Sequence, residues 1–267
     1  MSYFHLNLIL KGKLTVCCLL MLPAIPLNAQ REAKQIGDFK ESISLNEHLR
    51  GTKRTLQYRP DGDEFVCVNG KNRYTRALYG SHSPFRVETS DRPVFAFYNN
   101  GRGGNISFKV ILRDGTELAL DCTGHCESRY SAGKRTYYLT DPSWGKGELR
   151  ISVLALADMD GAIWRFSPSN MPKGAILRWQ HGGATGKRLS RNGDMGVDPA
   201  DCFELPAEAT DLVTGELPLQ KEVYLVRGEV PEGYNVRKLY QQAEAASLAL
   251  ASHLKIETPD PYLNTLG

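Results

Sequence analysis

Asp158 and Asp160 are the residues whose types and spacing come closest to a pair of catalytic carboxylates. Hydrolysis of a glycosidic bond needs two carboxyl groups, about 5–5.5 Å apart for retention of configuration and about 6.5–9.5 Å apart for inversion. The pair lies between two apolar runs, however, and Asp-x-Asp-Gly between two strands is first of all a hairpin turn. We therefore assign both carboxylates to a turn and predict no catalytic residue in this chain.

The polar segment from His181 to Cys202 is the best candidate for a ligand-binding surface. It has neither a helical nor a strand period, and polar loops longer than about 12–15 residues are more often functional than idle. His181, Lys187, Arg191 and Asp194 offer the hydrogen-bonding groups that a sugar ligand requires. The alternative is an ordered loop that packs on itself or on a neighbouring domain, with a structural salt bridge between Arg191 and Asp194.

Three tryptophans could stack on sugar rings, because aromatic faces bind sugars in many carbohydrate sites. Trp164 and Trp179 lie within apolar runs, so we expect them in the core. Trp144 lies in a turn-rich segment, where it could be an exposed stacking platform or a further buried ring. We include Trp144 among the candidate ligand-binding residues.

Residues 1–29 have the pattern of a cleaved signal peptide. Lys11 and Lys13 precede an apolar run, Leu14–Leu22, and a small residue, Ala29, stands where signal peptidase would cut. The apolar run is about half the roughly 20 residues that a membrane-spanning helix needs. We therefore expect an exported protein, periplasmic, secreted or associated with the cell surface, with no membrane span.

The remaining chain has the composition of a globular domain. Its formal net charge of +3 is spread along the chain without a basic block, so we predict no nucleic-acid partner. Mean hydropathy is −0.36. The roughly 240 residues after the leader could form one large all-β domain or two small ones.

Four of the six cysteines lie after the leader. Cys122 and Cys126 flank a tight turn, and in an oxidising compartment they could form a disulfide or remain inert thiols. A zinc site needs about four ligands, and no second pair has ligand spacing. We predict no metal and no cofactor.

Short strands follow one another from residue 57 to about residue 230, which predicts a large antiparallel β-sandwich. Asn69-Gly70 separates two of them, Glu64–Val68 and Tyr74–Tyr79, and predicts a hairpin because Asn-Gly tolerates the positive φ of a type I′ turn. Other predicted strands are Arg92–Tyr98, Asn105–Leu112, Glu117–Leu120, Arg135–Thr140, Glu148–Ala155, Gly161–Phe166, Ala175–Trp179 and Glu222–Arg227.

The period changes after residue 230. Apolar residues recur every three or four positions from Asn235 to Leu254, which predicts an amphipathic linker helix within residues 231–257. Its apolar face needs a partner, either the sandwich or another domain. Residues 30–56 would be an amino-terminal extension, and Thr258 or Asp260 would cap the first turn of a second helix in residues 258–267.

Two segments carry a family resemblance. Thr258-Pro259-Asp260-Pro261-Tyr262-Leu263-Asn264 after a β-sandwich and a linker helix is similar to the junction in six-hairpin glycosidases, where a large "supersandwich" precedes an (α/α)6 catalytic barrel. Trp179–Gly183, Arg191–Pro199 and Phe203 resemble the amino-terminal part of a domain-of-unknown-function family in large exported, polysaccharide-degrading proteins of Bacteroidetes. The resemblance covers about Gln57 to Gly267.

The resemblance implies a glycoside hydrolase-like parent protein whose catalytic carboxylates lie in a helical barrel, which this sequence lacks. The chain would then be the non-catalytic amino-terminal domain of a carbohydrate-active protein, with the barrel and a glycan as its partners. A free-standing carbohydrate-binding or structural β-sandwich is the alternative.

Overall fold

The computed structural model describes residues 57–80, 83–99, 102–131, 133–183, 203, 212–251 and 255–266. The predicted signal peptide and extension lie outside these residues. The first strands of the chain are β1 (Arg59–Asp61), β2 (Glu64–Val68), β3 (Arg76–Tyr79), β4 (Arg86–Thr89), β5 (Phe95–Asn99), β6 (Arg102–Ile111) and β7 (Glu117–Ala119). The later strands are β8 (His125–Ser131), β9 (Lys134–Thr140), β10 (Glu148–Ala155), β11 (Gly161–Ser169), β12 (Ile176–Gly183), β13 (Leu212–Pro218) and β14 (Val223–Gly228). The helices are η1 (Leu120–Cys122), η2 (Pro142–Trp144), α4 (Val236–Ala251) and α5 (Pro261–Leu266).

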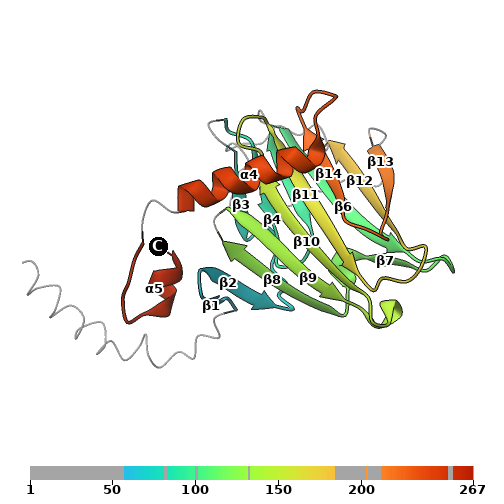
Figure 1. The fold of residues 1–267 in the computed structure, drawn as a ribbon, viewed down its shortest axis with the longest axis horizontal. Helices are drawn as coiled ribbons and strands as arrows, with labels where there is room; N and C mark the ends of the chain where they lie inside the picture. Colours follow the sequence, from blue (N-terminus) through green and yellow to red (C-terminus); the bar gives the residue numbers. More distant parts are fainter. Residues whose placement is uncertain are drawn as a thin grey trace, which may run out of the picture. The chain divides into compact units, whose positions relative to one another are not determined.

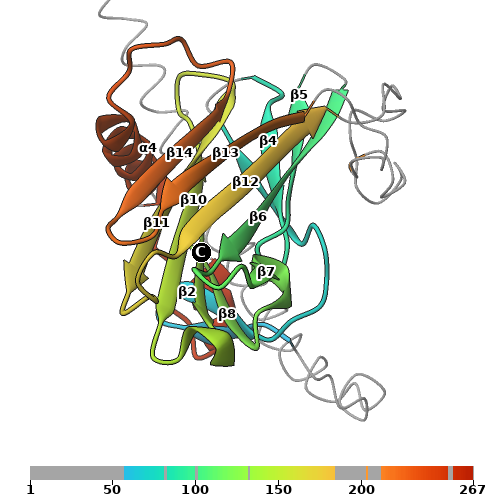
Figure 2. The ribbon, with the colours of Figure 1, turned by 90° about the vertical axis from the view of Figure 1, so that its right-hand side faces the viewer.

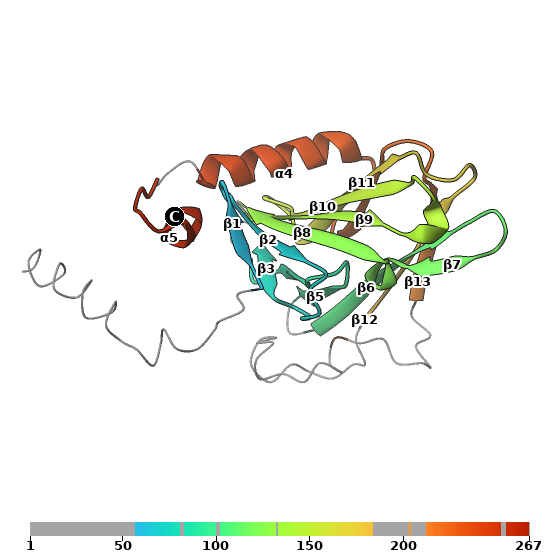
Figure 3. The same ribbon diagram turned by 90° about the horizontal axis from the view of Figure 1, so that it is seen from below.

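The strands form two sheets that face each other. Sheet A has the order β1-β2-β8-β9-β10-β11-β14, and sheet B has the order β13-β12-β6-β5-β4-β3, with β7 added beside β6. Figure 3 shows the two sheets as successive layers below α4. Every strand pair is antiparallel, so the predicted all-β sandwich is confirmed.

The main core lies between the sheets. Because side chains alternate along a strand, every second residue points inward. Trp164 of sheet A is fully buried against Phe95 and Phe108 of sheet B, with ring centroids 5.6 and 5.9 Å away. Trp179 is 9% exposed and belongs to the same cluster. The prediction that Trp164 and Trp179 are core residues is confirmed.

Helix α4 covers the outer face of sheet A (Figure 1). Its first turn is capped by Asn235, whose Oδ1 accepts a hydrogen bond from the Lys238 amide at 3.0 Å. Leu239 and Tyr240 are buried in a second cluster with Ile163 of β11 and neighbouring side chains of sheet A. The sandwich is thus the partner of the predicted apolar stripe, at least over the first half of the helix.

The predicted hairpin at Asn69-Gly70 is wrong. Strand β2 pairs with β1 and β8 in sheet A, whereas β3 pairs with β4 in sheet B. Asn69 has the expected positive φ of 51°. Its backbone amide and side-chain oxygen nevertheless bond the carbonyl and amide of Cys126, at 2.8 and 2.9 Å, which fixes it beside β8. The chain then crosses to the other sheet.

Two smaller predictions hold. Asp158 and Asp160 lie in the turn of the β10–β11 hairpin. Asp260 caps α5, because its Oδ1 accepts a hydrogen bond from the Tyr262 amide at 2.8 Å.

No helix within the described ranges combines the length and the apolar character that crossing a membrane requires.

Candidate ligand-binding site

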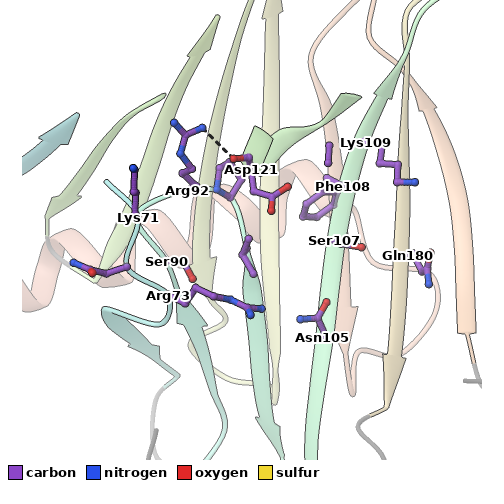
Figure 4. Close-up of a pocket in the computed structure, with 14 residues that line it drawn as sticks. Lys71, Arg73, Ser90, Arg92, Asn105, Ser107, Phe108, Lys109, Asp121 and Gln180 are labelled. Atoms are coloured by element: carbon purple, nitrogen blue, oxygen red, sulfur yellow. Dashed lines mark hydrogen bonds between the residues drawn. The ribbon is translucent and has the colours of Figure 1, made fainter. Parts of the chain in front are cut away.

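A concave surface on the outer face of sheet B is the best candidate site in the described part of the chain. It has a volume of about 600 Å³, and most of its lining residues are polar or charged. The lining residues are Lys71, Asn72, Arg73, Ser90, Arg92, Pro93, Val94, Asn105, Ser107, Phe108, Lys109, Ala119, Asp121 and Gln180. We call this the outer pocket. Figure 2 shows the strands of sheet B that carry it, and Figure 4 shows its side chains.

Strands β6 and β12 form one wall of the outer pocket. Ile106, Phe108 and Val110 are buried in the core cluster, so the alternate residues of β6 point outward. Asn105, Ser107 and Lys109 are these alternate residues, and Gln180 of β12 lies opposite Ser107. The alternation places amide, hydroxyl and amine groups in a row on one rigid surface.

The loop from Lys71 to Arg73 forms the opposite wall. Asp91 holds it through two backbone contacts: the Asn72 amide donates to Asp91 Oδ2 and the Asp91 amide donates to the Asn72 carbonyl, each at 2.9 Å. A third bond runs from the Tyr74 amide to Ser90 Oγ at 2.8 Å. The loop is therefore fixed to the β4–β5 connection and is preorganised for binding.

Gly70 permits this close approach. A Cβ atom at this position would lie 2.4 Å from Oδ2 and 2.6 Å from Cβ of Asp91, closer than real Cβ contacts. Only glycine therefore fits between the end of β2 and the Asp91 side chain without displacing one of them.

Asp91 belongs to a buried polar network that joins the two sheets. Arg135 of β9 lies with its Nη2 3.8 Å from Asp91 Oδ1, and both side chains are fully buried. The same Nη2 donates to Tyr58 Oη at 2.9 Å and to Ser128 Oγ at 3.0 Å, and Tyr58 Oη donates to Asp91. Burial raises the pKa of Tyr58, which keeps its hydroxyl protonated as a donor. The network anchors the pocket loop to both sheets.

The side chain of Arg73 has its own support. Its Nη2 donates to Tyr74 Oη at 3.1 Å, and the guanidinium lies 5.1 Å from the centre of the Tyr74 ring. The Tyr74 ring packs against Phe203, which is fully buried with Ala96 and Tyr98 on the outer face of sheet B. In Figure 4 the Arg73 side chain extends from its loop toward Asn105 on β6.

The outer pocket contains a single carboxylate, that of Asp121, among its described lining residues. Hydrolysis of a glycosidic bond needs two carboxyl groups. In the described residues no group of three or more His, Cys, Asp or Glu side chains is placed to hold a metal ion. The amide, hydroxyl and cationic side chains that are present can form hydrogen bonds with a polar ligand.

Residues 100–229 match a protein family described as a domain of unknown function, DUF4450. The match runs from β6 to β14 and includes Asn105, Ser107 and Gln180 of the pocket wall. Lys71, Arg73 and Arg92 precede it. The outer pocket is thus shared between the DUF4450 match and the segment before it. No curated protein matches the chain.

Three of the predicted ligand-binding residues, Lys187, Arg191 and Asp194, fall within the DUF4450 match but outside the described residues. His181 is described, and it lies at the end of β12 on the core side, not in a ligand loop. Its Nδ1 accepts a hydrogen bond from Arg227 Nε at 3.0 Å, and its ring lies 5.2 Å from that of Phe97. Burial, followed by the charge of Arg227, lowers the pKa of His181 to about 4. A neutral His181 therefore links β12 of sheet B to β14 of sheet A.

The structure decides the alternatives for Trp144 in favour of a buried ring. Trp144 is 2% exposed and belongs to the main core cluster. It ends η2, whose first turn is capped by Asp141, with Oδ1 accepting from the Ser143 amide at 2.9 Å. This short helix turns the indole inward, so Trp144 is not an exposed stacking platform.

Cys122 and Cys126 are free thiols, so the disulfide alternative is not realised. Cys122 is exposed at the end of η1, whereas Cys126 is fully buried in β8. Burial raises the pKa of the Cys126 thiol to about 12. The second alternative, inert thiols, describes Cys126 well.

Sequence patterns did not single out the outer pocket, because its residues come from distant segments and each looks like an ordinary surface residue. The only signal within one segment is the polar alternation Asn105, Ser107, Lys109, and many half-exposed strands share such an alternation. Sheet pairing brings this row next to residues 71–73 and 90–94.

Proposed function

We propose that this chain is the non-catalytic, amino-terminal β-sandwich domain of an exported carbohydrate-active protein, and that it binds a glycan in the outer pocket. The observation that carries the proposal is the lining of the pocket: amide, hydroxyl and cationic side chains with one carboxylate among the described residues. Sugars present many hydroxyl groups, which donate to and accept from amide side chains such as those of Asn105 and Gln180.

Preorganisation supports the proposal further. Both walls of the outer pocket are held before any ligand binds, one by the ladder between β6 and β12 and the other by the hydrogen bonds of Asp91. A fixed site loses little conformational entropy on binding, which matters for a ligand as polar as a sugar. The leader pattern of residues 1–29 supports the exported setting.

A glycan array with the purified chain tests the proposal. We expect binding to at least one polysaccharide fragment, and we expect Asn105→Ala and Gln180→Ala each to weaken it about threefold to tenfold through loss of one or two hydrogen bonds. Lys173→Ala is the matched control, because Lys173 is exposed and does not line the pocket. Absence of binding to every glycan, or binding that both pocket variants leave intact, would contradict the proposal.

The proposal that this chain has no hydrolytic activity of its own is tested separately. We expect no release of reducing ends when the chain is incubated with the glycan that it binds. Hydrolysis by this chain alone would contradict the proposal. The coding sequence after Gly267 tests the proposed partner: repeated helical hairpins in the same protein or in an adjoining reading frame support a glycosidase parent, and an unrelated gene would count against it.

A structural support role is the second candidate. Leu263 and Leu266 on α5 are 50% and 70% exposed, although the same helix packs its Tyr262 against Phe65 of β2. Exposed leucines beside a packed aromatic are suited to contact with a further domain. Absence of binding on the glycan array, together with a higher melting temperature of the chain when a helical domain is co-expressed with it, would favour this structural role.

A further inference from the structure

Arg150 of β10 and Arg165 of β11 lie on the outer face of sheet A, whereas the outer pocket belongs to sheet B. Arg150 pairs with Ser167 and Arg165 pairs with Ser152, so the two arginines are diagonal neighbours on adjacent strands. Diagonal neighbours on one face of a sheet are roughly 7–8 Å apart, within reach of each other's long side chains. Both arginines are half-buried. The fold therefore holds two guanidinium groups close together.

Two tyrosine rings orient these guanidinium groups. The Arg165 guanidinium lies 4.6 Å from the centre of the Tyr240 ring of α4, and the Arg150 guanidinium lies 5.3 Å from that of Tyr138 on β9. Such cation–π contacts orient a guanidinium without cancelling its charge. The Nε atom of each arginine is buried without a hydrogen-bond partner among the described residues. Only the Nη groups are then left to bind a ligand.

The carboxylates around the two arginines are engaged elsewhere or too far away. Glu244 of α4 lies 3.0 Å from Lys134 Nζ, and Glu222, just before β14, lies 4.0 Å from Arg237 Nη2. Glu148, at the start of β10, is exposed. In the described part of the chain no Asp or Glu side chain lies within ion-pair distance of either guanidinium. Both positive charges are therefore uncompensated there.

Arg129 of β8, on the same face, has the usual partners of such a residue. Its guanidinium lies 2.9 Å from Asp61, 3.1 Å from Glu64 and 2.6 Å from Glu127. A half-buried charge without such partners costs free energy, because it has lost part of its hydration. Two such charges side by side also repel each other. This cost is typical of a binding site, where a ligand supplies the missing charge.

We propose that Arg150 and Arg165, the arginine pair, bind the carboxylate or sulfate groups of an acidic glycan. Guanidinium groups bind these anions through two parallel N–H groups. The choice of a glycan as the source of the anion rests on the proposed function, but the arginine pair is a site separate from the outer pocket. Strands β9, β10 and β11 extend beyond α4 (Figure 1), so an extended polymer can lie across them.

Matched ligands test the inference without any mutation. Calorimetric titrations compare tri-galacturonate with its fully methyl-esterified form, and a sulfated trisaccharide with its desulfated form. We expect one acidic member to bind at least about tenfold more tightly than its neutral counterpart, and this advantage to shrink at about 0.5 M relative to about 0.05 M NaCl. The two pairs of ligands distinguish carboxylate from sulfate as the recognised group.

Arginine variants test the location. Arg150→Gln and Arg165→Gln should each reduce the advantage of the acidic ligand about threefold to tenfold. Arg113→Gln is the matched control and should leave the advantage unchanged, because Arg113 is exposed in the turn after β6, on the other sheet. Arg150→Lys keeps the charge without the planar pair of N–H groups, so its loss should be smaller. Thermal melts identify any variant that fails to fold, and Arg150→Lys then decides the question.

The pocket variant Asn105→Ala separates this inference from the proposed function. The advantage of the acidic ligand should survive in it. Equal affinity for both members of both ligand pairs would overturn the arginine pair and leave the outer pocket in place. A preference that persists in both glutamine variants would overturn the assignment to Arg150 and Arg165. Binding that Asn105→Ala leaves intact and Arg150→Gln abolishes would contradict the outer pocket alone, and absence of binding to any glycan would overturn both proposals.

Discussion

Arg135 of β9 and Asp91 of the β4–β5 connection form an ion pair across the sandwich, with Nη2 3.8 Å from Oδ1 and both side chains fully buried. The pair joins the two sheets. Asp91 also accepts a hydrogen bond from the Asn72 amide, so the same pair is connected to one wall of the outer pocket. A buried pair adds little net stability when intact, but loss of one partner leaves an uncompensated charge in the interior. Stability and binding are therefore coupled at this point.

Asp91→Ala should reduce the free energy of unfolding by about 3–5 kcal/mol. The substitution leaves the buried Arg135 charge without its partner and removes the acceptor of the Tyr58 hydroxyl. Urea denaturation measures the change. Glu216→Ala, which breaks a half-exposed ion pair with Arg178, should cost less than about 1 kcal/mol. A similar loss in the two variants would contradict a special role for the buried pair.

Gly70→Ala should destabilise the chain by about 1–3 kcal/mol, because the new Cβ atom would collide with Asp91. Gly62→Ala is an informative comparison. Gly62 has a φ of +61° but open space around it, so only backbone strain of about 1 kcal/mol is expected. Chemical denaturation of both variants separates collision from strain, and glycan binding should weaken in Gly70→Ala alone.

Trp144→Ala should cost about 3–5 kcal/mol, as removal of a large buried ring does. Trp144→Phe should cost less, because most of the apolar contact remains. If Trp144→Ala left the melting temperature unchanged and abolished glycan binding, the ring would be an exposed platform after all.

His181 should make the fold less stable at acidic pH. Its pKa is about 4 in the folded chain and 6.5 ordinarily, so the unfolded chain binds the proton more readily. Stability from this group is fully present above pH 6.5 and is lost as the pH falls toward 4, by on the order of 2 kcal/mol after allowance for partial exposure.

His181→Gln tests this pH dependence. Glutamine can still accept the hydrogen bond of Arg227 but does not titrate. Denaturation midpoints of the variant should fall less than those of the original chain between pH 6.5 and 4.5. The difference in denaturation midpoint between the two proteins should stay constant above pH 7. If the two plots of midpoint against pH were parallel at all pH values, a lowered pKa of His181 would be contradicted.

The cysteines should differ in reactivity. Brief alkylation of the native protein, followed by peptide mass spectrometry, should label Cys122 and spare Cys126, because Cys126 is buried and its pKa is raised to about 12. Both should react after unfolding. A peptide that contains a Cys122–Cys126 bridge under non-reducing conditions would contradict the free thiols.

Local patterns in the sequence were enough to predict most of the strands and the long helix. The ten predicted strands all correspond to strands of the structure, and the apolar stripe after residue 235 corresponds to α4. Alternation and helical period depend only on neighbours along the chain, so they can be read directly. Strands β1, β4, β8 and β13 were not predicted, because their sequences are short or too polar to alternate clearly.

The pairing of strands and the binding surface depended on contacts between distant residues. Asn69-Gly70 has the local chemistry of a hairpin, but its bonds to Cys126 and the proximity of Gly70 to Asp91 send the next strand to the other sheet. The same crossing brings Lys71 and Arg73 opposite Asn105 and Gln180.

The sequence by itself determined the all-β class, the core tryptophans of β11 and β12 and the amphipathic helix, because each follows from local periodicity. Only the tertiary structure decided that Trp144 is buried, that His181 faces the core and that a pocket with many polar residues forms on sheet B, because the environment of a side chain is set by what packs from elsewhere in the chain.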